Sequence, residues 1–140
     1  MRTASTTMLA AMLVIGSGCS SDDDSADPVV VFDDTTCEAN VTRWPGDGSP
    51  IVVRNESSKL MALIVGTYNE GHSRTDLVDY AESWEGGSAR PDFVSATEIR
   101  EVGPRSERPL LLEADPGLYF AVCMAMPDTM AVADDVVIPG

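Results

Sequence analysis

Short apolar runs recur along the chain from residue 29 onward, and residues that favour turns separate most of them. Such runs, bounded by glycine, proline and small polar residues, are typical of β-strands. We predict strands at residues 29–32, 37–43, 50–54, 60–68, 93–102, 108–113, 118–125 and 133–138. The clearest turns are predicted at 44–48 and 114–117, where proline sets φ and glycine tolerates a positive φ. Many short strands with turns between them predict an all-β, antiparallel sandwich.

One segment has helical rather than strand periodicity. Between Thr75 and Trp84, apolar residues recur at three- and four-residue spacing, at Leu77, Val78, Tyr80, Ala81 and Trp84. This spacing places them along one face of a helix. Either Ser73 or Thr75 can cap the first amides. We therefore predict a single short helix inserted among the strands.

The strand predicted near the C-terminus is apolar on both faces. Alternation places one set of side chains on the first face and a second set on the other, at Tyr119, Ala121, Cys123 and Ala125, and at Leu118, Phe120, Val122, Met124 and Met126. A strand of this kind lies in the middle of a sheet, with other elements packed on each side.

The N-terminus has the pattern of a lipoprotein signal peptide, predicted over residues 1–18. An apolar run from Met8 to Ile15 is followed by small residues and then by Cys19. This run is too short for a permanent membrane span, which needs about 20 apolar residues, but it suits a cleaved signal. Small residues before a cysteine favour lipidation of Cys19, although Gly16 stands where leucine is usual in bacterial lipoproteins. The alternative is an ordinary secreted protein cut elsewhere.

Composition separates a tether from a folded domain. Residues 19–28 are acidic and hold no apolar side chain larger than alanine, so we predict a disordered spacer ahead of a domain at 29–140. The chain has 9 basic and 23 acidic residues, a formal net charge of −14, which excludes nucleic acid as a partner. With 44% apolar residues, the domain can still bury one core.

The cysteine count predicts one disulfide. If Cys19 carries a lipid, Cys37 and Cys123 remain, and a single pairing is possible. An oxidising compartment outside the cytoplasm favours that bond. Closing so long a loop stabilises a fold by roughly 4 to 5 kcal/mol in the chain-entropy treatment.

Two segments resemble the cupredoxin family. Residues 115–123, Asp-Pro-Gly-Leu-Tyr-Phe-Ala-Val-Cys, look like the strand that supplies the copper thiolate, and residues 52–65 look like the strand and loop that carry the first histidine. The resemblance implies a cupredoxin-like Greek-key sandwich. Blue copper needs two histidines with the cysteine, but Met61 and Met126 hold those places and Met130 lies near the axial position.

The resemblance leaves two roles open for Cys123. A site of Cys123, Met61, Met126 and Met130 is soft enough for Cu(I), which is the alternative function. We favour a disulfide and space-filling methionines, because a loose set of uncharacterised bacterial cupredoxin-like lipoproteins also joins an early cysteine to this strand. The lone histidine, His72, lies in a polar loop and is expected to be solvated.

No enzyme motif is present in the sequence. There is no glycine-rich phosphate loop, no Cys-x-x-Cys pair and no histidine at a usable spacing from a nucleophile. We therefore expect a non-catalytic protein without metal or cofactor. The predicted function is an interaction or structural module of the bacterial cell envelope, held outside the cytoplasm by its lipid anchor on the cell membrane or outer membrane. Its expected partners are that membrane and an envelope protein or ligand.

Overall fold

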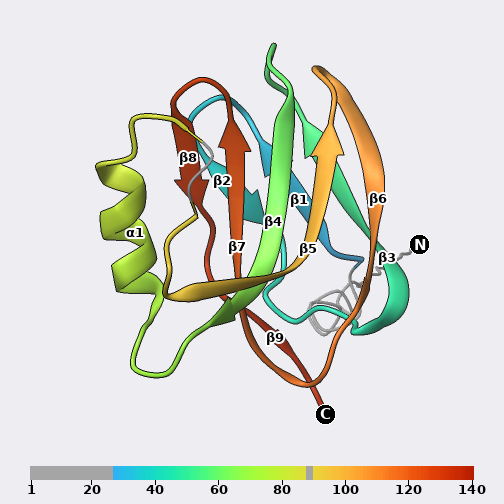
Figure 1. Ribbon diagram of the computed structural model, residues 1–140. Helices are drawn as coiled ribbons and strands as arrows, with labels where there is room; N and C mark the ends of the chain where they lie inside the picture. The colour runs from blue at the N-terminus through green and yellow to red at the C-terminus, as the bar shows by residue number, and fades with distance from the viewer. Residues whose placement is uncertain (1–26, 88–89) are drawn as a thin grey trace, which may run out of the picture.

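The structure is a computed structural model that describes residues 27–87 and 90–140. Strands and one helix follow each other along the chain (Figure 1), and their bounds are β1 Val29–Phe32, β2 Cys37–Ala39, β3 Asp47–Asn55, β4 Met61–Tyr68, α1 Arg74–Glu82, β5 Val94–Val102, β6 Ser106–Glu113, β7 Gly117–Ala125, β8 Thr129–Val132 and β9 Val136–Ile138. Cys19 and the predicted signal peptide lie outside the described residues, as does most of the predicted tether.

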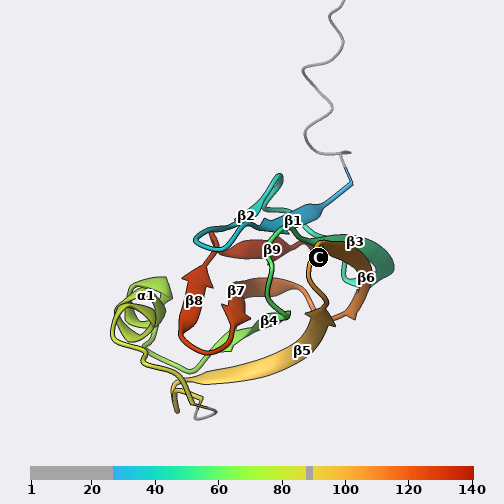
Figure 2. The same cartoon turned by 90° about the horizontal axis from the view of Figure 1, so that it is seen from above.

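The strands form two layers that face each other (Figure 2). The first sheet has the order β2-β1-β3-β6 and the second has the order β5-β4-β7-β8, with β9 paired to β7. The helix α1 lies beside β8 at one side of the second sheet. This all-β sandwich with one inserted helix agrees with the cupredoxin-like architecture that the sequence predicts.

One strand pair departs from the predicted antiparallel pattern. Strands β1 and β3 are parallel, with Val30 opposite Val53, because the chain leaves β2 and crosses to the other side of β1 before β3 begins. The crossing segment is held by backbone hydrogen bonds to β9, from Trp44 N to Val137 O at 3.0 Å and from Val137 N to Thr42 O at 2.7 Å. The Trp44 side chain is buried there. The strand predicted at 37–43 therefore ends at Ala39, and the strand predicted at 50–54 begins earlier, at Asp47, so residues 40–46 form the connection in place of the turn predicted at 44–48.

A further difference lies after β7, where strand β8 was not predicted. Its four residues, Thr-Met-Ala-Val, do not alternate between apolar and polar, and all four are partly exposed in the structure. The sequence therefore gives no strand pattern there. Pairing with β7, at Ala125 opposite Thr129 and Met124 opposite Met130, forms the strand instead. The strand predicted at 133–138 is correspondingly shorter and begins at Val136.

The predicted helix is confirmed, with its start one residue earlier. Ser73 is the N-cap residue, with extended backbone, and its amide donates a hydrogen bond to Asp76 Oδ2 at 3.0 Å. A carboxylate in the first turn also interacts favourably with the partial positive charge of the exposed amides. Leu77 is the buried residue of the helix. The side of α1 that carries Leu77 therefore faces the second sheet.

Apolar side chains form two layers, one on each side of the second sheet. The larger layer fills the space between the sheets and includes Phe32, Trp44, Leu63 and Leu110. The smaller layer lies on the outer face, beneath α1, and its buried members are Leu77, Val94, Phe120 and Val122. Strand β7 thus has packed apolar residues on both faces and lies inside the sheet, as predicted; its neighbours there are β4 and β8.

Candidate functional site

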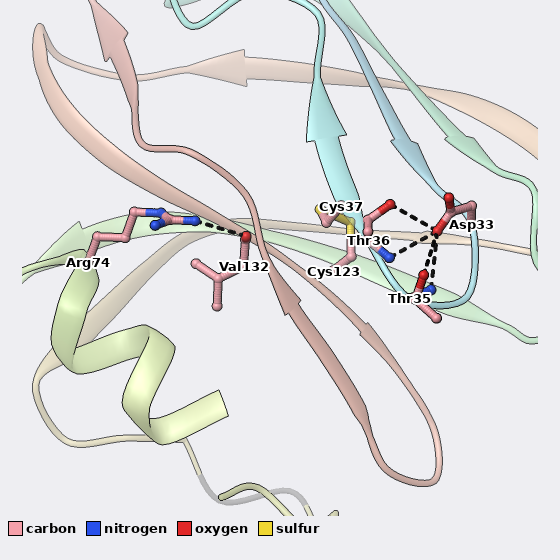
Figure 3. The surroundings of a disulfide bond; sticks show 7 residues. All are labelled: Asp33, Thr35, Thr36, Cys37, Arg74, Cys123 and Val132. Carbon is pink, nitrogen blue, oxygen red and sulfur yellow. Dashed lines mark hydrogen bonds between the residues drawn. A yellow bond between two sulfur atoms is a disulfide. The ribbon is translucent and has the colours of Figure 1, made fainter. Parts of the chain in front are cut away.

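The predicted disulfide between Cys37 and Cys123 is confirmed (Figure 3). The two Cα atoms are 5.8 Å apart, within the range that a disulfide spans. Cys37 begins the edge strand β2 and Cys123 lies in the middle strand β7, so the bond joins the two sheets. Their exposed fractions are 4% and 0%. The thiolate that the cupredoxin resemblance offered for copper is therefore part of a buried structural bond.

A tight turn before Cys37 positions it for this bond. Asp33 Oδ1 accepts hydrogen bonds from the backbone amides and hydroxyls of Thr35 and Thr36, at 2.9 to 3.3 Å. These bonds, the backbone bond of Thr36 most of all, lower the pKa of the Asp33 carboxyl. Asp34 takes a positive φ of 93° in the same turn. The turn returns the chain so that Cys37 pairs with Phe32 across the hairpin.

The structure does not bring the four Cu(I) ligands of the alternative hypothesis together. Met61 and Cys123 point into the layer between the sheets, where both are fully buried. Met130 is opposite Met124 on the other face of the same sheet, and Met126 is 57% exposed beyond the end of β7. The hypothesis was wrong because it carried over positions along the chain without the β7–β8 pairing, which places Met130 on the outer face.

His72 lies in an exposed loop before α1, as expected. Its ring stacks on Phe93 with ring centroids 4.9 Å apart, and Nδ1 lies 3.3 Å from Asp76 Oδ2. The side chain is 42% exposed, and these two contacts, which the sequence did not predict, restrain its ring. Within residues 27–87 and 90–140, histidine, cysteine and carboxylate side chains form no group of three that could hold a metal ion. No helix in those ranges is long and apolar enough to cross a membrane.

Asn55, at the end of β3, is a buried polar residue that joins three segments. Its Nδ2 lies within hydrogen-bonding distance of the carbonyl oxygens of Lys59, Val102 and Gly103, at 2.6 to 3.1 Å. Its Oδ1 accepts from the amide and hydroxyl of Ser57, at 2.9 and 2.7 Å. A buried amide is tolerated only when its polar atoms are paired in this way. Asn55 therefore has a structural role at the end of the sandwich.

A polar cluster fixes α1 against the outer edge of the second sheet. Arg74 Nη2 donates to Val132 O at 3.2 Å (Figure 3), and Arg74 Nε donates to Ala133 O at 2.8 Å. Tyr68 donates its hydroxyl hydrogen to Asp135 Oδ1 at 2.6 Å. Burial, the hydrogen bond to Asp135 and the charge of Asp135 raise the pKa of Tyr68, which the charge of Arg74 only partly offsets. These contacts satisfy edge carbonyls of the sheet and hold the helix in place.

The outer face of the second sheet contains a cavity of about 240 Å³ that the sequence did not predict. Its floor comes from β4, β5, β7 and β8, and includes Ile64, Phe120 and Val122. Leu77 of α1 lines one side, and Arg90 and Pro91 line another. The apolar second face of the strand at 118–126 was the available signal. It indicated that something packs there, but not that the packing leaves a hollow.

No protein-family model matches the chain, and no curated protein matches it either. Among solved structures, the fold is similar to the crystal structure of Na-dithionite-reduced auracyanin from the photosynthetic bacterium Roseiflexus castenholzii. The similarity has a TM-score of 0.40 at 15% sequence identity, and it covers 75% of this chain and 92% of the auracyanin chain. At that level it carries no conclusion about what this chain binds.

Proposed function

We propose that the chain is a lipid-anchored protein outside the cytoplasm, whose disulfide-locked sandwich acts as a non-catalytic interaction module of the cell envelope. The observation that carries this proposal is the buried Cys37–Cys123 bond. It supports an oxidising compartment, where such bonds form and persist. It also leaves Cys19 as the one cysteine of the sequence outside the pair, next to the small residues that a lipidation signal requires.

The same bond supports a function without copper. A copper thiolate needs a deprotonated cysteine, whereas the sulfur of Cys123 is bonded to the sulfur of Cys37. Met61 is packed among core residues and is not accessible from solvent. The role of the sandwich is therefore better supported as a rigid surface at the end of a tether than as a metal carrier.

Fractionation of the producing cells tests the anchor. We expect wild type in the membrane fraction, with a diacylglycerol adduct in its intact mass, and Cys19→Ser in the soluble extracytoplasmic fraction. The matched control is Ser20→Ala, which leaves the thiol in place and should stay with the membrane. A membrane-bound Cys19→Ser protein, together with an unmodified wild-type mass, contradicts the anchor.

Copper titration tests the proposal that the sandwich functions without copper. The oxidised protein is expected to bind no stoichiometric Cu(I) against a competing chelator. Reduction of the disulfide under denaturing conditions, followed by refolding, supplies the comparison in which both thiols are free. Stoichiometric Cu(I) binding by the oxidised protein contradicts the proposal.

A further inference from the structure

The cavity on the outer face of the second sheet has the features of a small-molecule site. Its volume is about 240 Å³, larger than the roughly 150 Å³ of an apolar protein cavity that holds benzene. Aliphatic, aromatic and thioether side chains provide its surface, among them Ile64, Ile99, Phe120, Met124 and Met130. Ligand sites are typically apolar hollows of this kind with a small number of polar groups at defined places.

The walls of the cavity are fixed before any ligand arrives. Arg74 ties the start of α1 to the carbonyl oxygens of Val132 and Ala133. On the other side, Asn69 Nδ2 donates to Asp92 O at 2.9 Å, and the amide of Asn69 donates to Phe93 O at 2.8 Å. These bonds hold the segment that leads into β5. A preformed site loses little affinity to ordering of the protein.

Arg90 is the charged residue among those that line the cavity. It is exposed, and it makes no ion pair with the residues that the structure describes. The chain has 9 basic and 23 acidic residues, so a cation at the edge of an apolar hollow is a rare local feature on this surface. A guanidinium group matches the two oxygens of a carboxylate with two parallel hydrogen bonds.

We propose that this cavity binds a small amphiphilic monocarboxylic acid, with its hydrocarbon part against Phe120, Val122 and Met124 and its carboxylate at Arg90. A hydrocarbon part of about seven to nine non-hydrogen atoms suits a hollow somewhat larger than a benzene site. The site is independent of the proposed anchor, because it lies on the second sheet and uses no residue before β4. The N-terminal segment enters at β1, in the opposite sheet, so it is not the favoured occupant.

Methionine methyl groups provide a direct test with internal controls. In the chain carrying Cys19→Ser, with ¹³C-labelled methionine methyl groups, octanoate is the probe. Met124 and Met130 line the cavity, whereas Met61 lies between the sheets and Met126 lies at the end of β7. We expect saturable shifts at Met124 and Met130 and unchanged resonances for Met61 and Met126. Equal shifts at all four, or no shift at millimolar octanoate, overturn the proposal.

A second ligand and two variants distinguish the contribution of the ligand's charge to binding from that of its shape. Octanamide has nearly the shape of octanoate without its charge, and should bind about tenfold more weakly, the loss expected for one charge-assisted interaction. Arg90→Gln should weaken octanoate about tenfold and leave octanamide unchanged. Arg105→Gln, which removes a charge from the turn between β5 and β6, is the matched control and should leave both affinities unchanged. If wild type binds octanoate and octanamide with equal affinity, Arg90 does not bind the carboxylate, and the proposal of a carboxylic acid ligand is overturned.

Filling the cavity tests the location. Ala96 is a partly buried residue that lines it. Ala96→Leu should abolish octanoate binding, while the methyl spectrum should show that the protein remains folded.

Two other occupants of the cavity would give distinct signatures. Met124 and Met130 resonances that differ between the lipidated protein and Cys19→Ser indicate the protein's own acyl chain, and resonances that depend on protein concentration indicate a second copy. Either result overturns the proposal of a free acid.

Discussion

The two faces of the second sheet carry similar side chains but are covered in different ways. The inner face meets another sheet, and its residues, such as Leu63 and Val65, are fully buried. The outer face is covered by α1 and by the segment before β5, which bury Phe120 and Val122 but leave other residues, such as Ile64, partly exposed. A broad sheet can match another sheet along its whole length, whereas one helix of nine residues covers only part of it.

This difference separates the closed layer from the layer that contains the proposed ligand site. The inner layer is closed by packing of the two sheets against each other and by the buried Cys37–Cys123 bond. The outer layer combines the apolar contacts of Phe120 and Val122 with polar contacts of Arg74 and Tyr68 at its margins. Gly66 lies at a β-bulge on this sheet, where a Cβ would collide with Ser95 O and reach to 2.8 Å from the Phe120 ring. The outer floor is therefore shaped by close backbone approach as well as by packing.

The largest expected effect is loss of the disulfide in the inner layer. Cys37→Ala should lower the free energy of unfolding by roughly 2 to 5 kcal/mol, because the unfolded chain is no longer constrained across a long loop. Urea unfolding of the variant and of oxidised wild type gives the difference.

Wild type reduced under denaturing conditions and then refolded is the control for this experiment. Its stability should fall to near that of Cys37→Ala, and Cys123 should then react with a thiol reagent on unfolding. If oxidised wild type and the variant unfold at the same urea concentration, the bond does not stabilise the inner layer as described.

Much of the inner layer could be predicted from the sequence, since its signals are local. Alternation in residues 118–125 identified both faces of β7, and the cysteine count identified the bond. The β1–β3 parallel pair could not be predicted in this way, because its partners are far apart in the sequence and local periodicity does not identify them. Strand β8 was missed because its four residues show no alternation, and it forms by pairing with β7. The cavity was missed for a related reason, since its walls come from five separated elements.

The next effect compares adjacent residues on opposite faces of β4. Leu63→Ala should lower the free energy of unfolding by about 2 to 4 kcal/mol, because it opens a hollow in a fully buried layer. Ile64→Ala should cost about 1 kcal/mol, because Ile64 is partly exposed and already borders a cavity. Urea unfolding of the two variants measures the contrast.

The Met124 and Met130 methyl groups provide a check on Ile64→Ala, because an enlarged cavity should change their resonances more than that of Met61. Equal losses of stability in the two variants would show that the outer layer is packed as tightly as the inner one, which contradicts the comparison.

The smallest effect is a pH dependence at the edge of the outer layer. The pKa of Tyr68 is raised above its usual value of 10.0, first by burial and then by its hydrogen bond to Asp135. Above pH 10 the unfolded chain therefore loses this proton while the folded chain keeps it, so the folded state binds more protons and its stability falls as pH rises.

Tyr68→Phe removes the titrating hydroxyl together with its hydrogen bond. The variant should be less stable than wild type at pH 8, and the gap should narrow between pH 9 and about 11 as wild type loses its advantage. Urea unfolding at a series of pH values measures both curves, and a constant gap across that range would show that the Tyr68 hydroxyl is not protected from ionisation by its place beside α1.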